Sequence, residues 1–278
     1  MFTKPSLLLI LSIIFSTSLF SLPSFDEASG GSVRGNRKKI AIYEELYEKN
    51  NYENAVYQDE PLIPKIIHQI WVGSELPEKF KKYVESWKKT HPDWEYKLWT
   101  DKDIDDFEFI NKREFDLATN KGTKSDIWRY EILYKYGGVY LDTDYECKKK
   151  LDAIHHTCDF YGSFCDKDCI AGNGVIGCKA GHPIILACIK KISKLDKKKL
   201  DNPFMSTGPI MFTNSIMNYL IKEKNKDNKI IIYPPIFFHP FPSKHRFSFW
   251  KNELASSFID SFIVPETFAV HYWATSWQ

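Results

Sequence analysis

The sequence predicts an α/β fold with a mostly parallel sheet. From residue 61, runs of branched residues alternate with runs at helical spacing, in the order strand, helix, strand, helix, strand. The chain has 278 residues, 43% hydrophobic and 15% aromatic, which suffices for one large core or two small ones. A net charge of +2, spread over the length, gives no basic field and argues against a nucleic acid as partner.

Each element follows from a local signal. "IPKIIHQIWVG" (63–73) is rich in branched residues and bounded by Pro and Gly, which predicts a buried strand. "LPEKFKKYVESWKKTHP" (76–92) shows helical spacing up to a proline, and "WEYKLWTD" (94–101) alternates as a second strand. A helix through "DIWRYEILYKY" (126–136) should end at two glycines, before the strand "VYL" (139–141). We further expect a strand at 172–178, helices at 183–195 and 207–221, and a solvated face at "KLDKKKL" (194–200).

The first 22 residues differ in composition from the rest. The apolar stretch after Lys4 predicts a cleaved signal peptide or an uncleaved membrane anchor over 1–22, while a buried helix is the weaker alternative. Residues 23–60 are predicted to be a polar stem or linker with one short helix, and residues 61–278 the main folded domain. A Golgi-like lumen of the secretory pathway, a membrane-anchored state and secretion from the producing cell all stay open.

All six cysteines lie in one short window. Behind an export signal, this clustering predicts one to three local disulfides of unknown pairing. A zinc site is the weaker alternative, because no Cys-x2-Cys pair occurs. The cysteines are Cys147, Cys158, Cys165, Cys169, Cys178 and Cys188.

Asp142 and Asp144 follow the strand at 139–141. Ligands gather beyond the carboxyl ends of strands in such sheets, and at a strand-to-loop turn both carboxylates can reach one divalent cation. A cation held by one or two carboxylates keeps open positions, which suits a diphosphate. The plain alternative is a pair of turn or capping aspartates.

In its context, "TKSDIWRYEILYKYGGVYLDTDYE", the pair resembles the motif of the glycosyltransferase family defined by a DXD-containing sugar-binding region. That family includes fungal Golgi mannosyltransferases and is distantly similar to the glucosyltransferase domains of large clostridial cytotoxins. The resemblance covers about residues 61–278 and rests on six blocks in order: "IPKIIHQIW", "SWKKTHPDWEYKLWTD", "SDIWRYEILYKYGGVYLDTD", "GNGVIGCKAGHP", "STGP" and "HYWATSW". It implies a GT-A fold, a nucleotide-sugar donor, and Mn²⁺ or Mg²⁺ at Asp142 and Asp144.

The resemblance also implies roles for individual residues. Asp126 and Arg129, one helical turn apart, would bind the donor's sugar hydroxyls and complete a catalytic set with Asp142 and Asp144; the plain alternative is a surface ion pair. Trp71 would stack on the nucleobase, although core packing is a serious rival.

The resemblance also places Asn173 near the donor sugar and the acceptor. The alternative is that Asn173 simply forms a turn. In the block "HYWATSW", His271 would be a third metal ligand, and Ser276 and Trp277 would donate hydrogen bonds to the leaving group. The alternative is that this segment is only a packed terminal strand. His68, by contrast, is expected to be a satisfied core or edge histidine.

The predicted function is therefore a retaining, metal-dependent glycosyltransferase. It would move a hexose from a GDP- or UDP-linked sugar to a glycan, lipid or protein acceptor. Same-face attack is favoured over a covalent intermediate on an enzyme carboxylate. The rivals are an Asp-x-Asp phosphatase, which would place the motif on its first strand, a lectin-like sugar-binding protein without turnover, and a nucleotide-sugar hydrolase.

Overall fold

The computed structural model describes residues 21–31, 33–165, 167–222 and 229–274. Its strands are β1 (Ile66–Ile70), β2 (Glu95–Trp99), β3 (Gly138–Leu141), β4 (Tyr145–Cys147), β5 (Phe160–Phe164), β6 (Ala171–Cys178), β7 (Ile230–Tyr233) and β8 (Ala269–His271). Its α-helices are α1 (Phe25–Ala28), α2 (Arg37–Asn50), α3 (Glu78–Thr90), α4 (Lys112–Leu117), α5 (Lys121–Tyr136), α6 (Asp152–His155), α7 (Pro183–Ile192), α8 (Lys197–Leu200), α9 (Pro203–Ser206), α10 (Pro209–Lys222), α11 (Pro235–Phe238), α12 (Arg246–Trp250) and α13 (Ser256–Asp260). Two short 3₁₀ turns, η1 (Asp101–Asp103) and η2 (Ser243–His245), complete the described elements.

A mixed sheet forms the centre of the fold, with strand order β2-β1-β3-β6-β5-β7. Strand β1 pairs in parallel with β2 and β3, and β5 with β7, whereas β6 runs antiparallel to both β3 and β5. A separate two-stranded ribbon joins β4 to β8 near the end of the chain. The α/β class is confirmed, and the antiparallel strand β6 is the departure from a fully parallel sheet.

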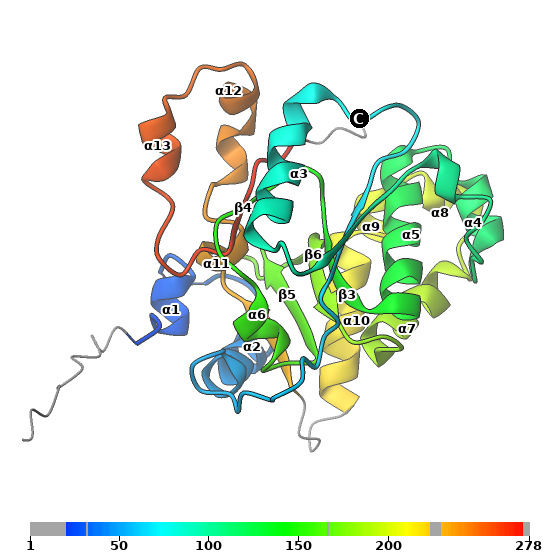
Figure 1. Ribbon diagram of the computed structural model, residues 1–278. Helices are drawn as coiled ribbons and strands as arrows, with labels where there is room; N and C mark the ends of the chain where they lie inside the picture. Colours follow the sequence, from blue (N-terminus) through cyan, green and yellow to red (C-terminus); the bar gives the residue numbers. More distant parts are fainter. Residues whose placement is uncertain (1–20, 32, 166, 223–228, 275–278) are drawn as a thin grey trace, which may run out of the picture.

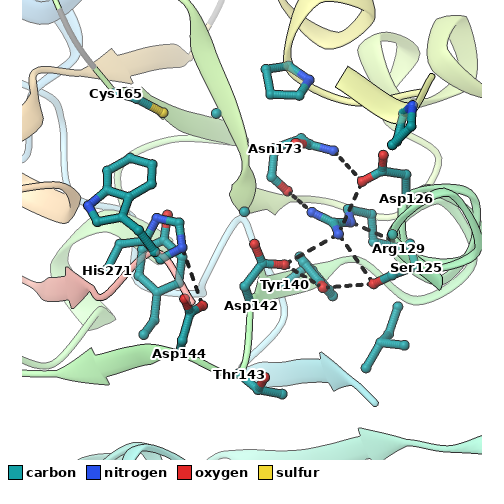
Figure 2. A pocket seen from close by; sticks show the side chains of 18 of the residues that line it. Ser125, Asp126, Arg129, Tyr140, Asp142, Thr143, Asp144, Cys165, Asn173 and His271 are labelled. Atoms are coloured by element: carbon teal, nitrogen blue, oxygen red, sulfur yellow. Dashed lines mark hydrogen bonds and ion pairs between the residues drawn. The ribbon is translucent and has the colours of Figure 1, made fainter. Parts of the chain in front are cut away.

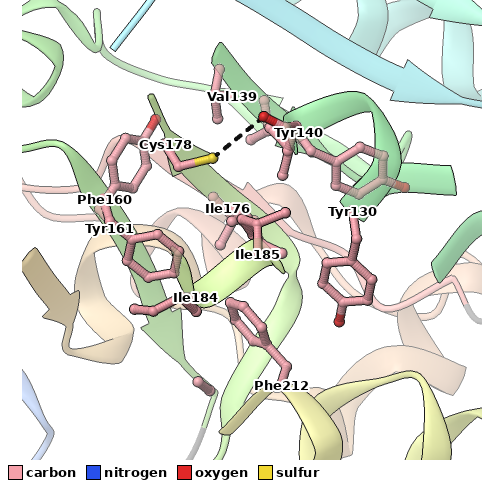
Figure 3. Packing of buried hydrophobic residues seen from close by; sticks show 14 of the residues in the cluster. Tyr130, Val139, Tyr140, Phe160, Tyr161, Ile176, Cys178, Ile184, Ile185 and Phe212 are labelled. Carbon is pink, nitrogen blue, oxygen red and sulfur yellow. Dashed lines mark hydrogen bonds between the residues drawn. The ribbon is translucent and has the colours of Figure 1, made fainter. Parts of the chain in front are cut away.

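Helices cover both faces of this sheet. Figure 1 shows α5, α7 and α10 on one side, and α1 and α2 on the other. The strands are buried because both faces are covered: every residue of β5, β6 and β7 is buried. Figure 3 shows Phe160 and Ile176 of the sheet packed with Ile184 and Ile185 of α7 and with Phe212 of α10.

The elements predicted from residue 63 onward are found with shifted ends. The predicted helix at 126–136 starts one turn earlier, because Asn120 caps it by accepting hydrogen bonds from the amides of Gly122 and Thr123. It ends at Gly137, whose φ of 67° favours glycine and whose added Cβ would lie 2.6 Å from the amide nitrogen of Ala180. This sharp exit directs β3 toward the loop that carries Asp142 and Asp144.

Residues 23–60 do not form the expected polar tether. Phe25, Tyr43 and Tyr47 of α1 and α2 are at most 3% exposed, and α2 packs against β7. The prediction failed because the buried tyrosines stand among charged residues, which hides the apolar face of α2 in the sequence. The segment 1–22, predicted to be a signal peptide or membrane anchor, lies almost wholly outside the described residues. Among the described residues, no helix combines the length and the apolar character that a membrane span needs.

Four of the six cysteines take no part in the one to three local disulfides that the sequence predicts. These four are buried free thiols: Cys147 on β4, Cys158 just before β5, Cys178 on β6 and Cys188 on α7. Their clustering in sequence reflects the density of core positions in this stretch, where cysteine acts as a small apolar side chain.

Candidate active site

The loop between β3 and β4 holds both aspartates of the motif. Its backbone is a tight turn in which the amide of Tyr145 donates to the carbonyl of Asp142 at 3.1 Å. The Asp142 amide in turn donates to the carbonyl of Gly174 on β6, at 2.9 Å. The predicted strand-to-loop position is confirmed, and Figure 2 shows both carboxylates next to the cavity.

Strand β8 places His271 next to the loop that holds the two aspartates. Strand β8 pairs with β4 so that His271 is opposite Tyr145, and the backbone amides of Tyr272 and Ala274 donate to the carbonyl and carboxylate of Asp144. As a result, His271 Nε2 lies 3.3 Å from Asp144 Oδ1. This part of the tail is a packed strand and at the same time a wall of the site.

Asp142, Asp144 and His271 form what we call the cation side of the cavity. One ligand atom from each lies within 4.8 Å of the others, and it is the only such group of three among the described residues. His271 Nδ1 is buried without a hydrogen-bond partner. Two carboxylates and one imidazole suit a divalent cation such as Mn²⁺, for which both oxygen and imidazole donors are acceptable.

Aromatic rings fix the imidazole of His271. Tyr145 stacks on it with centroids 4.2 Å apart and planes within 6°. Trp273 lies 4.1 Å away on a backbone with φ of 54°, a conformation that is uncommon for a bulky residue. His239 holds the Tyr145 hydroxyl at 2.7 Å. The ring is therefore oriented before any cation binds.

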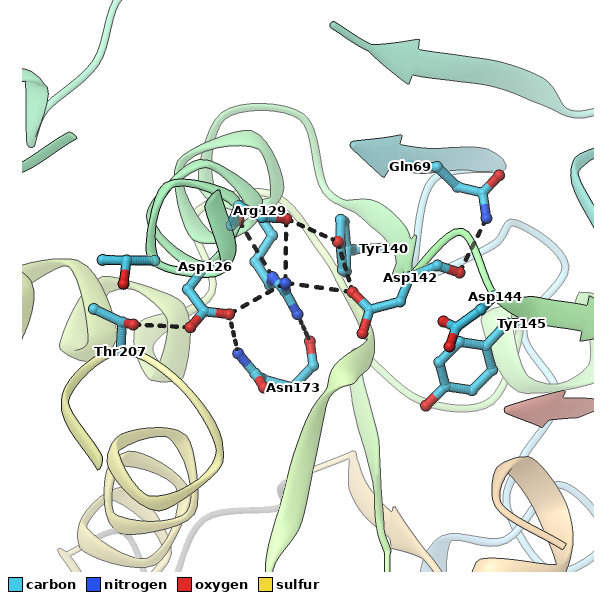
Figure 4. Close-up of polar contacts among 12 residues, drawn as sticks. Gln69, Asp126, Arg129, Tyr140, Asp142, Asp144, Tyr145, Asn173 and Thr207 are labelled. Carbon is cyan, nitrogen blue, oxygen red and sulfur yellow. Dashed lines mark hydrogen bonds and ion pairs between the residues drawn. The ribbon is translucent and has the colours of Figure 1, made fainter. Parts of the chain in front are cut away.

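On the opposite side, Asp126, Arg129, Asn173 and Thr207 form what we call the paired side. Asp126 Oδ1 accepts from Asn173 Nδ2 at 2.7 Å, and Oδ2 accepts from the Thr207 hydroxyl at 2.8 Å. Arg129 lies 3.1 Å from Asp126 Oδ1. Figure 4 shows these contacts as one closed network. Asp126 and Arg129 are thus a buried pair and not a surface one.

Arg129 also connects the two sides. Its guanidinium lies 3.3 Å from Asp142 Oδ1 and 4.4 Å from the centre of the Tyr140 ring. The Tyr140 hydroxyl donates to Asp142 Oδ1 at 2.8 Å. A Cβ at position 174 would lie 2.6 Å from Asp142 Oδ2, so that only glycine leaves space for this carboxylate.

The three carboxylates titrate differently because their surroundings differ. Burial raises the pKa of Asp126 to about 6, although Arg129, Thr207 and Asn173 act in the opposite direction. Burial also raises the pKa of Asp142, against the attraction of Arg129. For Asp144, His271 and the Ala274 amide outweigh burial and lower the pKa. At neutral pH the site therefore has an ionised Asp144 as its most acidic group.

A cavity of about 620 Å³ lies between the two sides. It is large enough for a small organic ligand of nucleotide-sugar size. Trp71 lines it beyond the end of β1, only partly buried, with its indole nitrogen donating to Ser74 at 3.0 Å. Lys121, Phe204 and Arg246 line other parts of the wall.

The structure brings most of the predicted site residues together. Asp126, Arg129, Asp142, Asp144, Asn173, His271 and Trp71 all line the cavity, whereas Ser276 and Trp277 lie outside the described residues. The role predicted for His68 is confirmed: it is buried, with one ring nitrogen 3.0 Å from the Gly137 carbonyl and the other accepting from Trp99 at 3.2 Å.

Sequence reasoning missed Tyr140, Tyr145, Thr207, Gly174 and His239. Tyr140 and Tyr145 flank the aspartates, and Thr207 stands in the quoted block "STGP", so a signal existed for these three. Gly174 and His239 gave none, because their roles depend on approaches between segments far apart in sequence.

Similarity to known proteins agrees with this geometry. The family described as "Glycosyltransferase sugar-binding region containing DXD motif" matches residues 77–161. Inositol phosphoceramide mannosyltransferase 3 of Schizosaccharomyces pombe is 30% identical over 236 residues, covering 80% of this chain and 64% of that protein. The uncharacterized glycosyltransferase L373 of Acanthamoeba polyphaga mimivirus is 31% identical over 188 residues, covering 64% of this chain and 74% of that protein.

The chain spans between 45% and 64% of the length of the three fission-yeast inositol phosphoceramide mannosyltransferases that it matches. Among solved structures, PaToxG glycosyltransferase is similar at 19% identity and a TM-score of 0.46, covering 66% of this chain and 80% of that one. This likeness is too distant to support an argument of its own.

The predicted family is thus confirmed, on a mixed sheet flanked by helices. The chain belongs to the glycosyltransferase family with the DXD-containing sugar-binding region.

Proposed function

We propose that this chain is a retaining hexosyltransferase that takes a sugar from a nucleotide-diphosphate donor, with Mn²⁺ or Mg²⁺ held by Asp142, Asp144 and His271. The observation that carries the proposal is the pairing of two unlike sides across one cavity. An incomplete cation site faces a closed network of sugar-type hydrogen-bonding groups.

The cation side fits the diphosphate end of the donor. Bound there, a divalent ion would supply charge stabilisation for the leaving phosphate. Arg129 and Tyr140 hold Asp142 in place, while the Ala274 amide and His271 hold Asp144. These contacts orient both carboxylates in advance.

The paired side fits the hexose. Carboxylate, guanidinium and amide groups are the usual partners of sugar hydroxyls, and Asp126, Arg129 and Asn173 present all three at the cavity wall. Trp71 offers an aromatic face for the nucleobase beyond the end of β1.

The state of Asp126 supports same-face attack. The carboxylates among the described residues that line the cavity are Asp126, Asp142 and Asp144. Both oxygens of Asp126 already accept hydrogen bonds, and Arg129 neutralises its charge, which makes it a weak nucleophile. In the proposed step the acceptor oxygen bonds to the anomeric carbon, the bond to the phosphate oxygen breaks, and the leaving phosphate takes the acceptor's proton.

The relatives suggest the sugar and the acceptor. Several of them carry names as inositol phosphoceramide mannosyltransferases, so mannose is the first donor sugar to test and a lipid the first acceptor class. Glycan and protein acceptors, and UDP as well as GDP donors, belong in the same test. The apolar N-terminal stretch favours a secretory or membrane location.

The test is the release of nucleoside diphosphate by the full chain across UDP- and GDP-sugars, with and without Mn²⁺. A chain starting at residue 60 would lack α2, which packs on β7, so the full chain is required. We expect Mn²⁺-dependent turnover of one donor, lost in Asp144→Ala and retained in Asp116→Ala, a change at an exposed residue that pairs with Lys112.

Three other outcomes would contradict the proposal in different ways. Donor binding without turnover, with all acceptor classes present, would favour a lectin-like protein. Turnover that is unaffected by every acceptor would favour a nucleotide-sugar hydrolase. No donor binding at all would remove the assignment of the Asp142 and Asp144 site.

A further inference from the structure

We propose that the rim of the cavity docks onto an anionic membrane surface. The rim patch is defined by Lys197, Lys198, Lys199, Phe204 and Met205 on one edge, and by Arg246 and Phe247 on the other. It goes beyond the proposed function, because glycosyl transfer as such requires no membrane.

The first edge combines exposed cations with exposed apolar side chains. Helices α8 and α9 lie next to each other, as Figure 1 shows. Lys197, Lys198 and Lys199 are exposed, and no carboxylate lies within ion-pair distance of Lys197 or Lys198 among the described residues. Phe204 and Met205 follow, at 51% and 53% exposure. Two adjacent large apolar side chains left in water, beside three lysines, match the chemistry of a lipid headgroup region.

The second edge, on an unrelated segment, places a partly buried cation beside an exposed apolar side chain. Phe247 of α12 is 63% exposed, the highest value among the exposed phenylalanines described. The Arg246 guanidinium lies 4.2 Å from the centre of the Phe247 ring; its Nη1 donates to the Ser243 carbonyl at 3.2 Å, and its Nε is buried without a hydrogen-bond partner. A cation over an exposed aromatic ring is again suited to the boundary between water and lipid.

Both edges of the rim patch border the same cavity, so that a membrane bound to the patch would lie next to the proposed active site. Phe204 and Arg246 line the wall that also holds Asp142 and His271. A membrane bound to both edges would cover the mouth, so that a lipid acceptor could present its headgroup to the cation side without leaving the bilayer. The charge favours anionic lipid, because segment 194–206 has four lysines and only two aspartates.

The experiment is hydrogen–deuterium exchange on the full chain with vesicles. An apolar N-terminus could bind vesicles by itself, and exchange separates the two effects because it reports which segment is protected. We expect amides in 197–206 and 244–251 to exchange at least roughly threefold more slowly on vesicles of phosphatidylcholine with phosphatidylserine than on pure phosphatidylcholine. Segment 107–117, which contains the exposed Ile110, should not change.

Two variants and their controls complete the test. Phe204→Ser with Met205→Ser should abolish the protection, whereas Ile110→Ser, at a residue of 60% exposure, should keep it. Lys197→Glu with Lys198→Glu should abolish it, whereas the same change of charge at exposed Lys38 and Lys49 on α2 should keep it. All four positions changed in the rim are exposed, so folding should be unaffected, which circular dichroism would check.

Equal exchange on neutral and anionic vesicles would overturn the proposal. So would protection that persists in both rim variants. Protection that grows with protein concentration in the absence of lipid would show that a second copy of the chain covers the rim instead. None of these outcomes depends on turnover, so a failure here leaves the proposed function untouched.

Discussion

The two sides of the cavity differ in how completely their polar atoms are paired. On the paired side, both oxygens of Asp126 accept hydrogen bonds and Arg129 neutralises the charge. On the cation side, Asp142, Asp144 and His271 converge, and His271 Nδ1 is buried without a partner. The paired side is therefore complete in the protein alone, whereas we propose that the cation side is completed by a bound positive ion. Damage on the paired side should accordingly lower the stability of the fold in addition to hexose binding, whereas damage on the cation side should lower activity alone.

The largest effect is expected for the loss of the Asp144 charge. Asp144→Asn keeps an oxygen that can accept from the Ala274 amide but removes a proposed cation ligand. Turnover measured by nucleoside diphosphate release should fall roughly 1000-fold, equivalent to about 4 kcal/mol. The melting temperature without added metal should stay within a few degrees of the wild type. A variant that melts far lower but keeps its turnover would reverse the assignment of the two sides.

The next effect concerns the stability of the paired side. Asp126→Ala leaves the Arg129 guanidinium buried with less compensation, and a broken buried pair costs about 3–5 kcal/mol. Urea denaturation should show this decrease in the free energy of unfolding. The double variant with Arg129→Met should regain a substantial part of it. A decrease in the free energy of unfolding of less than about 1 kcal/mol for Asp126→Ala would contradict the view that the paired side stabilises the fold.

A pH experiment extends the comparison from carboxylates to imidazoles. His68, unlike His271, has partners at both ring nitrogens, and burial lowers its pKa to about 4 from 6.5. Between those values the unfolded chain binds a proton that the folded chain does not, so the free energy of unfolding should fall as the pH falls. The wild type should lose up to about 3 kcal/mol more over this range than His68→Gln. Parallel profiles of denaturant midpoint against pH would contradict the prediction.

The smallest predicted effect is at Trp71, outside both sides. Replacing it with alanine removes the proposed stacking surface, and such stacking contributes about 1–3 kcal/mol. We expect the donor KM to rise roughly tenfold, with kcat nearly unchanged and Trp71→Phe intermediate. A decrease in kcat at constant KM would instead place Trp71 in the packing of the site, consistent with its contact with Phe80.

Much of the fold and of the cavity could be predicted because the signals are local. Asp142 and Asp144 stand at a strand end, and Asp126 and Arg129 share one helical face, so spacing alone places each pair. The antiparallel course of β6 and the packing of α2 could not be read in this way, because they depend on contacts between distant segments.

The same limit applies within the site. Nothing in the local sequence of Gly174 says that Asp142 approaches it, and nothing near His239 says that it holds the Tyr145 hydroxyl. The family resemblance points to His271, yet its place beside Asp144 comes from the pairing of β8 with β4. Long-range strand pairing thus decides which side of the cavity is incomplete.

The most direct test of this account is Mn²⁺ binding to the full chain, measured by electron paramagnetic resonance for three proteins. We predict one bound Mn²⁺ per wild-type chain, a similar affinity in Asp126→Asn, and an affinity at least about tenfold weaker in Asp144→Asn. That pattern would show that one side of the cavity is built for a cation and the other is complete without it. Equal binding by all three proteins, or none by the wild type, would contradict the account.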